Sequence, residues 1–209
     1  IASIQASYAK AEARARDSHH PELFYPALNR MAAELILNAG KPGGVKFDPA
    51  AVDEVRKSLA AKARDDPDFW SVAGFIELRM YTAIADRSLA AERPKIEGEF
   101  EELFTRVSAP SMWSSVIDQA SFVLPKYAAS AAGAERSAAE RSHDRTRRDE
   151  WPDARDGERA DPSKKTEGAA GEKQHGGLHQ QLPHEPATTG TEGGPHEALA
   201  RAWHRAGKN

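Results

Sequence analysis

The chain has 209 residues, a formal net charge of −3 and no cysteine. The missing thiols exclude disulfides, cysteine-ligated zinc, iron–sulfur clusters and thiol catalysis. Acidic and basic residues are mixed along the whole sequence, so electrostatics favours neither nucleic acid nor a membrane surface as a partner. No run approaches the roughly 18 apolar residues of a membrane span, and no secretory signal stands at the start. We therefore expect a cytoplasmic protein.

The composition changes after Tyr127. Beyond this residue the sequence contains no isoleucine, valine, methionine, phenylalanine or tyrosine, and its large apolar residues are Trp151, Leu178, Leu182, Leu199 and Trp203. So few apolar side chains cannot offset an ordering entropy of roughly 1–2 kcal/mol per residue. The sequence predicts a helical domain over residues 1–128 and a low-complexity, mostly disordered tail over 129–209, with one possible short helix at 195–206.

Three helices are predicted in the first third of the chain. Residues 3–17 are rich in alanine, arginine and glutamate, which are strong helix formers, and the helix ends before Pro21. A second helix at about 23–39 must hold Pro26 in its first turn, where a proline costs no hydrogen bond. Asp48-Pro49 opens the third, with the aspartate as N-cap.

Three more helices follow. The fourth, from Asp66-Pro67 to about residue 90, is apolar around so much of its circumference that it should pack on two neighbours. Pro94 begins the fifth, and a sixth opens at Pro110 and is limited by Pro125. The expected centre of the core consists of Trp70, Phe75, Ile76 and Met80. Because no segment has a convincing strand pattern, the predicted fold class is all-α, an antiparallel helix-hairpin array that is either a solenoid or an irregular bundle.

The histidines do not form a convincing metal site. His175 and His179 have the spacing that zinc-binding helices use, but Gly176-Gly177 would break such a helix. Glu140-Arg141-Ser142-His143 is a single Glu-x-x-His, whereas carboxylate-bridged metal sites need two with further glutamates. We expect no bound metal.

The remaining candidates for catalysis are equally weak. The fifth helix carries four glutamates that favour a solvated acidic face, Glu97, Glu99, Glu101 and Glu102. No phosphate-binding loop, dinucleotide fingerprint or Gly-x-Ser-x-Gly motif is present. We expect no cofactor and no enzymatic activity.

Residues 8–37 resemble the junction between two tetratricopeptide repeats. Tyr8-Ala9-Lys10-Ala11 precedes the turn, Pro21-Glu22-Leu23-Phe24-Tyr25 opens the next helix, and the small pair Ala32-Ala33 lies within it. The connection is longer than in that family, and no 34-residue period continues through residues 45–128. The resemblance implies a scaffold that holds peptides or domains in a concave groove and uses no cofactor.

In that family the first helix of the pair lines the groove, and here this is the helix at about 23–39, so Tyr25, Asn29 and Arg30 are the expected partner-binding residues. Asn29 has an alternative role, a hydrogen bond to a neighbouring backbone group within the stack. The leading hypothesis is a non-enzymatic scaffold for a protein or peptide partner. The alternative is an all-helical regulatory or small-ligand-sensing region that serves an enzymatic or signalling domain outside this chain.

Overall fold

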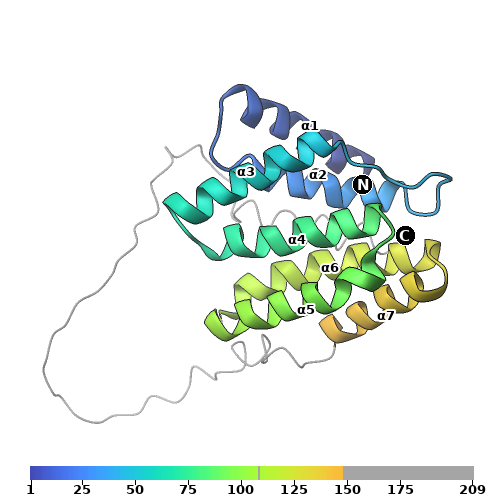
Figure 1. Cartoon of the computed structure of the whole chain (residues 1–209). Helices are drawn as coiled ribbons and strands as arrows, with labels where there is room; N and C mark the ends of the chain where they lie inside the picture. The colour runs from blue at the N-terminus through green and yellow to red at the C-terminus, as the bar shows by residue number, and fades with distance from the viewer. Residues whose placement is uncertain (108, 148–209) are drawn as a thin grey trace, which may run out of the picture. The chain divides into compact units, whose positions relative to one another are not determined.

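The computed structural model describes residues 1–107 and 109–147, and all of their regular structure is helical. Successive helices run back and forth along the array (Figure 1). They are α1 (Ala2–Asp17), α2 (Phe24–Leu37), α3 (Pro49–Asp65), α4 (Phe69–Ala85), α5 (Leu89–Arg106), α6 (Pro110–Ser130) and α7 (Gly133–Arg147). The all-α prediction is therefore confirmed.

Helices α2, α4 and α6 contact one another and form the centre of the array. Around them, α1 packs on α2, α3 on α2 and α4, α5 on α4, and α7 on both α5 and α6. The side chains buried between these elements are mostly aliphatic, and they include Ala27, Leu28, Met31, Leu59, Ile76, Met80, Val123 and Leu124. Burial of this apolar surface is the main stabilising term of the fold.

The predicted centre of the core is half confirmed. Ile76 and Met80 are buried, whereas Trp70 and Phe75 are half-buried. A different tryptophan, Trp113 of α6, lies in the densest aromatic contacts, with the ring of Phe69 at 5.2 Å and nearly perpendicular to it. Its indole Nε1 donates a hydrogen bond to the carbonyl of Val107 at 2.6 Å, so the buried polar atom is satisfied.

Two helix starts illustrate how local chemistry sets the boundaries. The Asp48 side chain accepts from the backbone N–H of Ala50 at 3.1 Å, as expected for the N-cap of α3. For α4 the N-cap is Asp68 instead of the predicted Asp66. Asp68 and Ser71 form a reciprocal capping box, which satisfies two otherwise orphaned donors and fixes the start two residues later.

Prolines mark neither the start of α5 nor the end of α6, contrary to the sequence prediction. Helix α5 begins at Leu89, so Pro94 lies inside it, and α6 continues through Pro125 to Ser130. An interior proline costs about 3 kcal/mol. Tertiary packing offsets this cost in α6, because Tyr127 beyond the proline is buried and donates to Glu135 at 2.7 Å.

Helix α7 extends the described helical region beyond the boundary expected at residue 128, which falls inside α6. Ala138 and Ala139 of α7 are fully buried. Glu135 accepts a hydrogen bond from the backbone N–H of Ala90 at 2.9 Å, which ties α7 to the first turn of α5. A helix whose buried face is built from alanine can thus pack closely on its neighbours without large apolar side chains. The remaining predictions for the tail, including the helix at 195–206 and the histidines from His175 onward, lie outside the described residues.

Among the helices that the structure describes, none combines the length and apolar character that crossing a membrane requires.

Candidate functional site

The structure turns Tyr25 and Asn29 towards the interior. Asn29 is only 3% exposed, and its Nδ2 donates to the backbone carbonyl of Tyr25 at 2.9 Å. This bond is the structural alternative proposed for Asn29 from the sequence. Tyr25 is half-buried, with its hydroxyl oxygen away from solvent. A partner therefore cannot reach the Asn29 side chain on the folded array.

Arg30 is engaged in ion pairs within the array. Its Nε pairs with the buried carboxylate of Glu12 on α1, and its Nη1 donates to Glu34 at 2.6 Å. Arg30 thus joins α1 to α2 while its side chain remains 19% exposed. Of the three predicted residues, it is the one that lies beside a surface groove, described below.

A chain of hydrogen bonds joins the three central helices. The Tyr81 hydroxyl on α4 donates to Oε1 of Gln119 on α6 at 2.6 Å, and Nε2 of Gln119 donates to Oδ1 of Asn29 on α2 at 3.2 Å. The Asn29 side chain in turn donates to the carbonyl of Tyr25, so the donors of these three hydrogen bonds follow one another from α4 to α6 to α2. The buried amides are therefore satisfied, and the chain specifies the register of three helices.

Glu77 of α4 lies beside these hydrogen bonds and is a charged residue type in an otherwise mostly apolar interior. It is 9% exposed, and burial raises the pKa of its carboxyl to about 8. No hydrogen bond or ion pair from the described residues reaches it. Burial also raises the pKa of Tyr25 and of Tyr81, and the neighbouring charge of Glu77 raises both further. The sequence carried a signal for this site, namely a single acid between Ile76 and Leu78 on a helix that is apolar nearly all round.

A groove opens at the surface between α2 and the start of α3, and we call it the α2–α3 groove. It encloses about 260 Å³. Its apolar floor consists of Met31, Phe47, Ala51 and Val52, and its charged rim consists of Arg30, Glu34, Lys46 and Asp48.

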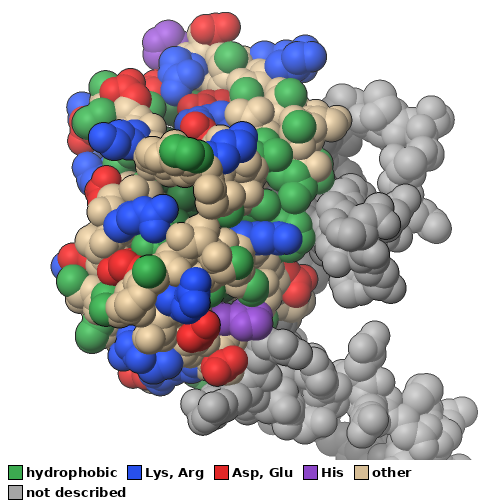
Figure 2. Space-filling view, turned by 90° about the vertical axis from the view of Figure 1, so that its right-hand side faces the viewer, with side chains coloured by type: hydrophobic (Ala, Val, Ile, Leu, Met, Phe, Trp, Pro, Cys, Tyr) green, Lys and Arg blue, Asp and Glu red, His purple; other side chains and the backbone are tan. Residues whose placement is uncertain are grey.

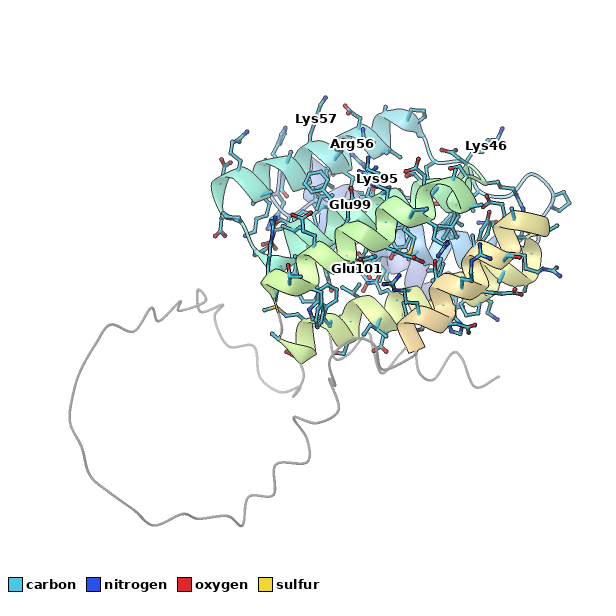
Figure 3. The ribbon with its side chains drawn as sticks, turned by 60° about the horizontal axis from the view of Figure 1, so that its bottom comes forward. Lys46, Arg56, Lys57, Lys95, Glu99 and Glu101 are labelled. Atoms are coloured by element: carbon cyan, nitrogen blue, oxygen red, sulfur yellow. The ribbon has the colours of Figure 1, made fainter. Side chains whose placement is uncertain are left out.

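The charged side chains of the rim differ in whether they already form ion pairs or hydrogen bonds within the array. Arg30 and Glu34 pair with each other, and Asp48 caps α3. Lys46 is exposed and forms no ion pair with any residue that the structure describes. In Figure 3 its side chain projects away from the body of the array near the end where α3 begins. The groove therefore has an apolar floor next to Lys46, a cation that forms no ion pair with a described residue.

The glutamates of α5 are ion-paired and do not form a purely solvated face. Glu97 accepts from Arg93 at 2.9 Å and from Ser142 of α7 at 3.1 Å, and it pairs with Arg145 of α7 at 3.2 Å. Glu99 pairs with Arg79 of α4 at 3.1 Å. The acidic residues therefore connect α5 to both of its neighbours.

The histidines of the described region have ordinary surroundings. Nδ1 of His20 accepts from the backbone N–H of Glu22 at 3.2 Å, within the turn between α1 and α2. Glu140 and His143 line an open depression between α6 and α7 together with Arg136. No group of three potential metal ligands occurs within residues 1–107 and 109–147.

The face shown in Figure 2 has no large patch of a single charge sign, because basic and acidic side chains are interspersed there with hydrophobic ones. No protein-family model, curated protein or solved structure matches this chain. The chain is thus an all-helical protein whose described part has seven helices, and no repeat family is assigned to it by comparison.

Proposed function

We propose that this chain is a non-enzymatic scaffold, a tetratricopeptide-like helical array that binds a protein partner through the α2–α3 groove. The observation that carries the proposal is the groove itself, with apolar side chains at its floor and charged ones at its rim. Helical surfaces hold peptides in this way, with an apolar floor that supplies affinity and rim groups that supply orientation. Arg30, expected from the sequence to contact a partner, belongs to this rim.

The rim also favours one kind of partner. Arg30 pairs with Glu12 and Glu34, and Asp48 accepts the N-cap hydrogen bond of α3, so Lys46 is the rim cation that forms no ion pair with a described residue. A peptide with an apolar side chain for the floor and an adjacent carboxylate for Lys46 would satisfy both parts of the groove. A basic peptide would leave the Lys46 charge opposed by a like charge.

Binding to peptides selected from a display library against the full chain tests this proposal. Fluorescence anisotropy should show at least a tenfold loss of affinity for Val52→Glu, because the variant places a charge on the apolar floor. Lys46→Glu should weaken binding of acidic peptides, and exchanging the peptide's acid for lysine should restore it. Circular dichroism would establish that each variant is folded.

Lys57→Glu is the matched control, since it makes the same charge reversal on exposed α3 surface outside the groove. It should bind like the unchanged protein. Equal affinities for Val52→Glu, Lys46→Glu and Lys57→Glu would show that the groove is not the binding site.

One observation favours the second candidate, a regulatory or small-ligand-sensing region. Glu77, Tyr81 and Gln119 bring polar groups together in the interior, and converging buried polar groups are typical of ligand sites. A ligand held there should raise the thermal midpoint of unfolding of the unchanged protein but not of Glu77→Gln. Peptide binding at the groove would be unaffected by that substitution, so the two candidates are distinguishable.

A further inference from the structure

The open depression between α6 and α7 shares no lining residue with the α2–α3 groove. The two helices are consecutive and lie side by side (Figure 1), and between them they leave a space of about 440 Å³. This volume falls within the range of roughly 300–1,000 Å³ that is typical of ligand pockets. The apolar lining comes from Pro125, Ala128 and Ala129 of α6, whereas the charged side chains come from α7.

Arg136 of α7 lines this depression in an orientation fixed by α6. Its Nε donates to the carbonyls of Ala128 at 3.2 Å and Ala131 at 3.0 Å, at the C-terminal end of α6, where carbonyls lack helical partners. Its two Nη groups form no hydrogen bond or ion pair with any residue that the structure describes. The edge of the guanidinium formed by Nη1 and Nη2 can therefore make two parallel hydrogen bonds to a carboxylate.

Glu140 lies one turn further along α7 and lines the same depression. Opposite charges at this spacing on a helix commonly pair, as Arg93 and Glu97 do at 2.9 Å. Glu140 forms no ion pair with Arg136 or with any other described residue, and the Nε of Arg136 is directed to the α6 carbonyls instead. A cation and an anion thus line one space without neutralising each other.

A separated cation and anion beside an apolar wall match the chemistry of a small zwitterion. A simple anion would be repelled by Glu140, and a simple cation would be repelled by Arg136. An α-amino acid carries both charges on adjoining groups, so its carboxylate suits Arg136 and its ammonium group suits Glu140. Its side chain would then contact Ala128 and Ala129. His143, one turn beyond Glu140, completes the lining.

We propose that this depression binds a free α-amino acid with a small apolar side chain, held at its carboxylate by Arg136 and at its ammonium group by Glu140. Both protein side chains are exposed, so water competes for the two charges. The dissociation constant should accordingly be modest, on the order of 0.1–1 mM. Because the ligand contacts both α6 and α7, its binding stabilises the packing of these helices. The site does not depend on the peptide groove.

Titration of the full chain with valine, followed by NMR of the backbone amides, tests this inference. Saturable shifts should appear in α6 and α7 around the depression and be absent from α2 and α3. N-acetylvaline lacks the ammonium group, and valinamide lacks the carboxylate. Each should bind at least tenfold more weakly than valine, because each leaves one charge of the site without its partner.

Two substitutions assign the two charges separately. Glu140→Gln should weaken valine binding at least tenfold but should not weaken binding of N-acetylvaline, which has no ammonium group. Arg136→Gln should weaken binding of valine and N-acetylvaline but leave that of valinamide nearly unchanged. Circular dichroism checks the second variant, since Arg136 also holds the end of α6. Glu140→Gln removes no described hydrogen bond and decides the question if Arg136→Gln does not fold.

Asp144→Asn is the matched control, because Asp144 is an exposed acid of the same helix that does not line the depression. It should bind valine like the unchanged protein. The inference would be overturned by the absence of saturable shifts in α6 and α7, or by equal affinities for valine and its two derivatives. Unchanged valine affinity in Glu140→Gln would also overturn it. Peptide binding is measured separately through Val52→Glu, so failure of either proposal is distinguishable from failure of the other.

Discussion

The contact of α4 with α3 and α2 differs in kind from the contact of α5 with α7. At the first, a Cβ added to Gly74 would lie 2.7 Å from Cδ2 of Leu59 and 3.2 Å from Cδ1 of Leu28, so side chains pack directly on the α4 backbone. At the second, the Glu97 carboxylate of α5 accepts hydrogen bonds from the side chains of Ser142 and Arg145 of α7. One interface is apolar and closely fitted, and the other contains charged and hydrogen-bonded side chains.

The two contacts should respond to different perturbations. A close apolar contact depends on side-chain volume, since an added or removed methyl group changes the packing at once, and it is insensitive to salt. A partly exposed ionic contact tolerates changes of volume and is screened by salt.

Leu59→Ala should lower the free energy of unfolding by about 2–5 kcal/mol, because Leu59 has no exposed surface and the variant leaves a cavity against Gly74. Urea denaturation of the full chain, followed by circular dichroism, measures this loss. Leu37→Ala near the end of α2, where the side chain is half-buried, should cost less. Equal losses for the two variants would contradict the close fit at Gly74.

Gly74→Ala should lower the free energy of unfolding by about 1–3 kcal/mol, although alanine is the better helix former. The added methyl group meets Leu59, which cannot move away freely because it is fully buried. Gly98→Ala on α5 is the matched control. A Cβ there meets nothing within 4 Å, so this variant should gain up to about 1 kcal/mol from helix propensity.

The double variant Leu59→Ala with Gly74→Ala sharpens the test. Since the first change removes the atoms that the second would strike, Gly74→Ala should cost little or nothing in that background. Additive losses in urea denaturation would show that the two residues do not share one contact.

The sequence was informative where apolar residues recur at helical spacing. Ile76 and Met80 were expected in the core and are buried, and the aspartate of Asp48-Pro49 caps α3 as predicted. The helical pattern is a local signal, and the structure follows it wherever packing and propensity agree.

The departures arise where tertiary contacts outweigh local rules. Pro125 lies inside α6 because packing beyond it compensates for the lost hydrogen bond, and α7 was missed because its buried face is built from alanine. The candidate site was even less accessible to sequence reasoning. Asn29 could be placed on a helix face, but whether that face turned outward depended on α6, whose Gln119 meets it from far along the chain.

Arg145→Gln addresses the ionic contact and should have the smallest effect. Arg145 pairs with Glu97 and Glu101 of α5 while remaining 37% exposed, so the loss in local stability of α7 should stay below about 1 kcal/mol. Hydrogen exchange of the α7 amides at 0.05 and 0.5 M NaCl measures it. In the unchanged protein the added salt should reduce protection, because it screens these pairs.

In Arg145→Gln this salt dependence should shrink, since the screened charge is gone. Arg141→Gln is the matched control, because Arg141 is exposed on the same helix and forms no described ion pair. It should keep the salt dependence of the unchanged protein. If both substitutions have the same effect, or if salt leaves α7 unchanged while lowering the protection of α3, then charge does not distinguish the two contacts. Apolar burial of Ala138 and Ala139 would then account for the docking of α7, as it does for the docking of α3 through Leu59.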